Sequence, residues 1–83
     1  MRTYRCSWEL ILNILNISQT KVGISNILYQ TRLSHPILSK HLKHLVSLGL
    51  IEETIADRSK TYFITEKGDK LLSRLKAVKR VLV

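Results

Sequence analysis

Residues 33–51 combine a helix start signal, an apolar stripe and a helix stop signal in one short stretch. Ser34 can cap a first turn, and Pro36 is tolerated there because its missing N–H would have no partner in a helix. Gly49 supplies the left-handed residue that often ends a helix. The stretch therefore predicts a helix over residues 35–48, and any fold of this chain must bury one face of it.

The two faces of this predicted helix differ in chemistry. The inward face is aliphatic and carries Leu38, Leu42, Leu45 and Val46 at helical spacing. The outward face is basic or hydroxylated, contains no acid, and consists of His35, Ser39, Lys40, Lys43, His44 and Ser47. Such a set of hydrogen-bond donors is suited to contacts with phosphates and base edges.

The region around this predicted helix carries positive charge and no negative charge. The 83 residues include 14 Lys and Arg but only six acids, which gives a formal net charge of +8. No acid lies between Leu10 and Ile51, whereas Lys21, Arg32 and the two lysines of the predicted helix do. A basic surface attracts nucleic acid or acidic lipid, so a polyanionic partner is expected.

Cysteine and histidine content argues against metal and cofactor sites. Cys6 is the single cysteine, so one chain has no internal disulfide and no cysteine-based zinc site, and a reducing intracellular setting is favoured. Near a helix start, this thiol is expected to be a packing residue; cross-linking of a dimer and redox sensing stay open as alternatives. His41 and His44 share a helix without an evident third ligand. We expect no metal and no cofactor.

The hydropathy pattern predicts one soluble, cytoplasmic domain over residues 1–83. The most apolar run, residues 8–17, is interrupted by Asn13 and Asn16. It is shorter than the roughly 20 residues that span a bilayer. The first residues also lack the apolar region and cleavage site of a signal peptide.

Periodicity and turn residues divide the chain into several elements. The predicted elements are a helix over residues 4–17, a brief strand at Val22, a helix over 24–32, the helix over 35–48, a β-hairpin over 51–64 with a polar tip at 57–60, and a helix over 66–82 capped by Thr65. In the hairpin, Tyr62 and Ile64 are expected to face the core and Phe63 the outside. Its register stays open, because Glu53 shares a face with Ile51 and Ile55.

The last predicted helix carries an apolar stripe at heptad spacing, formed by Leu71, Leu75, Val78 and Leu82. This stripe can pack on the first helix, on a second chain, or on both. Val81 and Val83 extend the apolar surface beyond what a small core needs. We therefore expect a homodimer formed through the first and last helices.

The order of these elements is that of a winged helix-turn-helix domain, an α+β and mainly α fold with a three-helix core, a β-hairpin wing and a C-terminal helix. The segments 33–36, 39–43 and 49–51 also resemble the recognition-helix region of ArsR- and MarR-type transcriptional regulators. Residues 62–68 resemble the end of the wing in small archaeal winged-helix regulators. The resemblance covers about residues 22–72.

The resemblance implies that the helix over residues 35–48 enters the major groove of DNA and that the hairpin tip contacts the backbone or minor groove. The DNA-binding residues expected on this basis are Ser34, His35, Pro36, Ile37, Ser39, Lys40, Lys43 and His44 on the helix, and Arg58, Ser59 and Lys60 on the wing. The cysteine motif of ArsR-type metal sensors is absent, so metal sensing of that kind is not expected.

These features predict a small homodimeric transcriptional regulator that binds double-stranded DNA sequence-specifically at a roughly palindromic site. No Gly-rich phosphate loop, nucleophile motif or paired carboxylates indicate an enzyme. Two alternatives stay open. Winged helices also serve as protein-interaction modules, and a basic domain can coat DNA without sequence preference.

Overall fold

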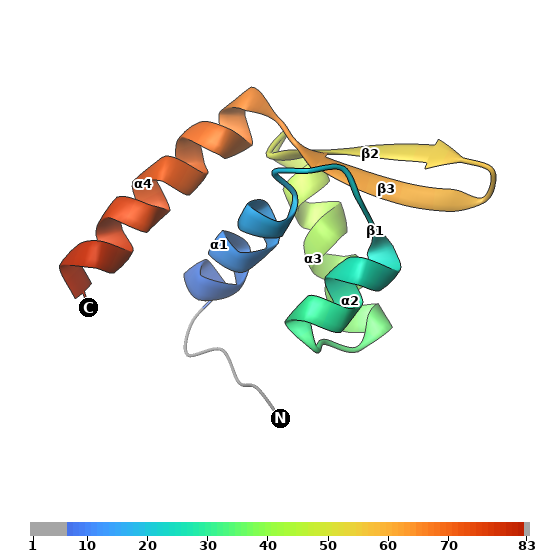
Figure 1. The fold of residues 1–83 in the computed structure, drawn as a ribbon, viewed down its shortest axis with the longest axis horizontal. Coiled ribbons are helices and arrows are strands. Elements are labelled where there is room, and N and C mark those ends of the chain that lie inside the picture. Colours follow the sequence, from blue (N-terminus) through green and yellow to red (C-terminus); the bar gives the residue numbers. More distant parts are fainter. Residues whose placement is uncertain (1–6, 83) are drawn as a thin grey trace.

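The computed structural model describes residues 7–82 (Figure 1). They form α1 (Ser7–Ile17), β1 (Val22–Gly23), α2 (Ile24–Thr31), α3 (His35–Ser47), β2 (Ile51–Ala56), β3 (Ser59–Ile64) and α4 (Glu66–Leu82). This order confirms the predicted winged helix-turn-helix architecture. Residues 4–6 of the predicted first helix, Cys6 included, lie outside the described residues.

The three strands form one antiparallel sheet in the order β1-β3-β2. The short strand β1 pairs with the wing, with Val22 opposite Tyr62. In β2, Glu53 lies opposite the same tyrosine. This pairing fixes the register that the sequence left open and ties the α1–α2 connection to the base of the wing. In Figure 1 the β2–β3 hairpin projects from one side of the helices, and α4 lies beside α1 on the other.

The core lies between the helices and the base of the wing. Leu38, Leu42 and Leu45 of α3 are at most 1% exposed, as the apolar stripe predicted. Tyr62 and Ile64 are buried while Phe63 is 44% exposed, which confirms the predicted faces of β3. Further along the hairpin, Ile55 is 65% exposed, because the wing extends beyond the helices that could cover it.

The hairpin tip is tighter than the predicted tetrapeptide. Ser59 and Lys60 already belong to β3, paired with Ala56 and Ile55, so Asp57 and Arg58 alone make the turn. Both turn residues have positive φ angles, 47° and 67°. Two successive positive φ angles are typical of the type I′ turn, whose twist matches that of the two strands it joins.

The ends of α3 follow the sequence signals with one difference. Ser34 occupies the N-cap position, but its hydroxyl makes no capping hydrogen bond. Gly49 has a φ of 76°, as expected for the residue after a helix. The hydroxyl of Ser34 therefore does not stabilise the first turn as predicted.

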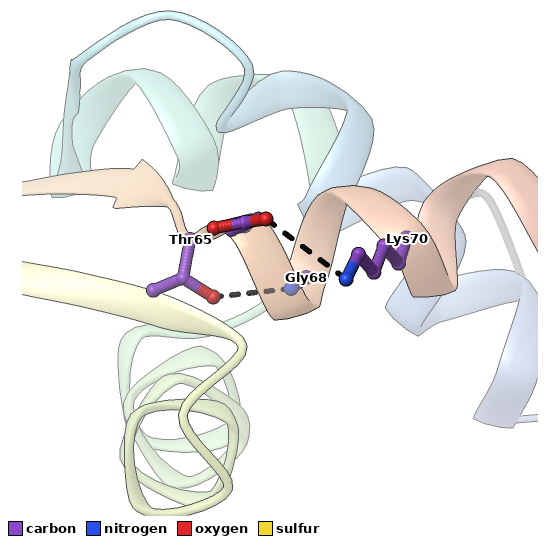
Figure 2. Close-up of polar contacts among 4 residues, drawn as sticks. Thr65, Gly68 and Lys70 are labelled. Carbon is purple, nitrogen blue, oxygen red and sulfur yellow. Dashed lines mark hydrogen bonds and ion pairs between the residues drawn. The ribbon is translucent and has the colours of Figure 1, made fainter.

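The start of α4 is fastened to the end of α3 by Thr65. Its N–H donates to the Leu50 carbonyl over 3.1 Å, and its hydroxyl donates to the Gly49 carbonyl over 2.5 Å. The same hydroxyl accepts the N–H of Gly68 over 3.0 Å, the predicted cap of α4 (Figure 2). Lys67 adds a bond from its ammonium to the Leu48 carbonyl. These bonds satisfy carbonyls of the three residues that follow α3, Leu48 to Leu50, and so hold α4 against the connection between α3 and β2.

Gly68 allows the two segments to approach this closely. The residue is buried, and a Cβ atom placed on it would overlap the carbonyl oxygen of Leu50 and come within 2.9 Å of Ile64 Cγ1. The backbone oxygen cannot swing away as a flexible side chain could. A glycine is therefore required at this position for steric reasons, although it lies within a helix.

We expect Gly68→Ala to lower the free energy of unfolding by about 1–3 kcal/mol, the usual range for an overpacked site. Without the contact, alanine in a helix would instead gain roughly 1 kcal/mol over glycine. Urea unfolding at fixed protein concentration measures the change. Ser73→Ala, on the exposed side of α4, is the control and should stay within about 0.5 kcal/mol. A stabilised Gly68→Ala protein would contradict the steric reading.

The apolar stripe of α4 divides into two parts. Leu71 and Leu75 are half-buried and pack against the core of the same chain. Further along, Val78 is 47% and Val81 86% exposed. The side chain of Leu82 lies outside the described part of the structure. The first half of the stripe is thus partly occupied by its own domain, and the second half is open.

Candidate nucleic-acid interface

The outward face of α3 is open to solvent. Seven of the eight residues predicted to bind DNA from this helix are exposed, namely Ser34, His35, Pro36, Ile37, Lys40, Lys43 and His44. Ser39 is half-buried, because it turns toward the wing. The burial of the aliphatic stripe against the core holds this face outward.

A groove joins α3 to the wing. It has a volume of about 520 Å³ and is lined by Gly23, Ile24, Ser25, His35, Ser39, Arg58, Ser59, Lys60 and Thr61. The structure thus brings together the start of α3 and the wing tip, which are separated by about twenty residues in the sequence. The sequence did not indicate the contribution of Ser25, because the pairing of β1 with β3 that carries α2 to the wing is a long-range contact.

The second half of α3 presents another open surface. Lys40, Lys43 and His44 lie on it together with His41 and Ser47. The predicted residues therefore fall into two adjoining groups, one in the groove and one along the helix, while Ser34, Pro36 and Ile37 are exposed beside them. Within residues 7–82, no group of three metal-ligating side chains comes together.

The cations of this face are not neutralised by neighbouring acids. In the part of the chain that the structure describes, the one ion pair joins Lys70 to Glu66 over 3.9 Å (Figure 2). Both residues belong to α4 and not to α3 or the groove. Glu66 and Asp69 line a shallow pocket beside Phe63, and no acid lines the groove. Positive charge at the groove and α3 is thus available to an external anion.

The wing is braced at its base by Tyr62. Its hydroxyl donates to Glu53 Oε2 over 2.8 Å across the β2–β3 pair. Burial, followed by the hydrogen bond to Glu53 and the charge of that carboxylate, raises the pKa of Tyr62 well above its usual value. The phenol therefore stays protonated at physiological pH, and its hydrogen bond occupies one of the acids of the wing.

Comparison with known proteins agrees with this geometry. The sequence profile described as winged helix-turn-helix matches residues 4–82, nearly the whole chain. The chain belongs to the winged helix-turn-helix family. Among solved structures, it is similar to the crystal structure of Sso10a-2, a DNA-binding protein from Sulfolobus solfataricus. The two share 27% identity with a TM-score of 0.86, over 93% of this chain and 81% of the other.

No curated protein sequence matches the chain. No helix in residues 7–82 is long and apolar enough to cross a membrane. The family match is longer than the region of about residues 22–72 over which the sequence resembled known regulators, since it takes in α1 and α4.

Arg58 places its charge at the wing tip in a conformation that favours glycine. Its φ of 67° lies in the left-handed region, which costs an ordinary L-residue roughly 1–2 kcal/mol. Asn-Gly is the preferred pair for a two-residue hairpin turn of this type. An arginine here thus places a positive charge at some expense of local stability.

We expect Arg58→Gly to raise the free energy of unfolding by about 0.5–1 kcal/mol, because relief of the left-handed strain exceeds the entropic cost of glycine. Urea unfolding measures the change. Ser59→Gly, one residue later in β3, is the matched control and should lose roughly 0.5–1 kcal/mol, since glycine weakens a strand. Destabilisation of equal size in both variants would show that the turn is unstrained.

Proposed function

We propose that this winged helix-turn-helix protein is a small transcriptional regulator that binds double-stranded DNA sequence-specifically. The observation that carries the proposal is the exposed face of α3, whose lysines have no acidic neighbour and which continues into the groove beside the wing. If acidic side chains paired with these lysines, or if another element covered them, this face would not attract a polyanion such as DNA. In this proposal, the protein regulates transcription through DNA binding alone: when it occupies a promoter, it blocks or recruits the transcription machinery.

The dimensions of α3 fit this role. Its 13 residues make a helix about 20 Å long, and the DNA major groove, about 12 Å wide, admits an α-helix. With α3 in the major groove, Lys40 and Lys43 reach phosphates or base edges. The wing tip with Arg58 then reaches the adjoining backbone or minor groove.

The comparison with Sso10a-2 supports DNA binding from an independent direction. That protein is described as DNA-binding, and its fold matches this chain over most of both lengths. At 27% identity, the likeness supports a common type of ligand. Recognition of one particular sequence rests on the outward side chains of α3, among them His35, Pro36 and Ile37.

We expect Lys40→Ala with Lys43→Ala to weaken duplex binding at every salt concentration. Each phosphate contact adds about 0.9 to the slope of log association constant against log salt, so loss of two contacts should reduce the slope by about 1.8. Fluorescence anisotropy with a labelled duplex, at several salt concentrations, measures both quantities. Circular dichroism checks that the variant is folded.

The control for net charge is Lys70→Ala with Lys76→Ala, which removes the same charge from exposed positions on α4. We expect this variant to keep most of the parent slope. If both double variants lose the same affinity, overall charge and not the face of α3 governs binding. If the parent shows no salt-dependent duplex binding, a protein-interaction role for this winged helix is favoured.

The second half of the α4 stripe supports a homodimer. Val78 and Val81 are exposed, and an exposed apolar strip that continues a packed one is typical of an interface. Leu71 and Leu75 already contact their own core, so we propose that they contribute to the dimer only at its edge. The dimer would present two α3 helices to major grooves about 34 Å apart.

Selection of bound sequences from a random duplex pool tests specificity and symmetry together. We expect the parent to enrich a two-fold symmetric site with half-sites about 10 base pairs apart. Val78→Glu should shift the sedimentation mass to that of a monomer and enrich a single half-site, because a charge is costly in an apolar interface. Ala77→Glu, on the exposed side of the same turn, is the matched control and should behave as the parent.

The outcomes of the selection separate the remaining roles. An enriched asymmetric site from the parent contradicts the symmetric dimer but keeps the regulator. Binding without any enrichment favours an architectural protein that coats DNA. An unchanged mass for folded Val78→Glu removes this stripe from the interface.

A further inference from the structure

The groove between the wing and the starts of α2 and α3 has room for an anion and carries positive charge. Its volume of about 520 Å³ far exceeds the roughly 30 Å³ that one water molecule occupies in the liquid. Arg58 and Lys60 line it from the wing, and none of its lining residues is acidic. A polyatomic anion such as a phosphate group fits these conditions.

Neutral donors surround the two cations. The hydroxyls of Ser25, Ser39 and Ser59 line the groove, and none has a hydrogen-bond partner within residues 7–82. The start of α2 also faces the groove at Gly23, which provides no side-chain cap for the first N–H groups of the helix. Hydroxyls, helix-terminal N–H groups and cations are the donors that bind phosphate oxygens.

His35, the first residue of α3, lines the same groove and is exposed. Histidine is the side chain that ordinarily changes charge near neutral pH. Arg58 and Lys60 are the charged groups that face it from the wing, while β1 and α2 contribute no charged residue to the groove. From α3 itself, Ser39 is the other lining residue. A negative partner for a protonated His35 therefore has to come from the ligand.

We propose that His35 takes up a proton when a backbone phosphate of duplex DNA enters this groove. The proposal rests on the DNA binding proposed above and adds a regulation to it. A complex that holds one more proton than its free components becomes tighter as pH falls. The backbone of a duplex is the source of the phosphate, because the groove adjoins the exposed face of α3 on which the duplex would lie.

The test measures duplex affinity between pH 6 and 8 at constant ionic strength. For the parent, we expect affinity to rise as pH falls, with one proton accounting for up to about tenfold per pH unit. His35→Gln should remove that contribution and leave a shallower dependence. Lys76→Gln, at an exposed position of α4, removes one positive charge outside both the groove and the α3 face, and should keep the parent's pH dependence.

NMR of the His35 imidazole resonance identifies the source of the phosphate. At a pH where the free protein shows the neutral form, a duplex should shift the resonance to the charged form. Inorganic phosphate at matched ionic strength should leave it near the free position; a full shift with phosphate alone would mean that the groove binds free phosphate, contrary to the proposal.

Failure of the proposal is distinct from failure of DNA binding. If duplex binds but His35→Gln keeps the parent's pH dependence, or the resonance stays neutral in the complex, proton uptake at this groove is excluded. If no duplex binds at any pH, the proposed function itself fails.

Discussion

The seating of α4 on the end of α3 is the contact on which the rest of the arrangement depends. Gly68 lies against the Leu50 carbonyl, and Thr65 bonds to the carbonyls of Gly49 and Leu50. Leu50 also begins the path into β2. One small region therefore sets the direction of α3, the wing and α4 together. A side chain at position 68 would push α4 away from Leu50 and Ile64, and so from the connection between α3 and the wing.

The second organising feature is the separation of charge. Two acids of the wing and α4 have partners of their own: Glu53 accepts the Tyr62 hydrogen bond, and Glu66 pairs with Lys70. The groove and α3 face keep their cations without such partners. Because no acid lines the groove or the outward surface of α3, this side of a strongly basic protein is electropositive, as binding of a polyanion requires.

Much of this fold follows from local patterns. The stripe from Leu38 to Val46 predicted the buried face of α3, and Thr65 predicted the cap of α4. The alternation in β3 predicted the burial of Tyr62 and the exposure of Phe63. Local patterns were less informative at the wing tip, where the same residues can form either a turn or a strand. The tip was expected to span residues 57–60, but strand pairing extends through Ser59 and leaves a two-residue turn.

The sequence by itself determined the elements, the electropositive character of α3 and the side chains on its outer face, because helical period and charge order are local properties. Only the tertiary structure decided that Ser25 joins His35 and Arg58 in one groove, since this depends on β1 pairing with a strand about forty residues later. It also decided how α4 divides its stripe, with Leu71 and Leu75 against their own core and Val78 in solvent. A heptad pattern cannot assign those roles, because it specifies a face and not the partner that covers it.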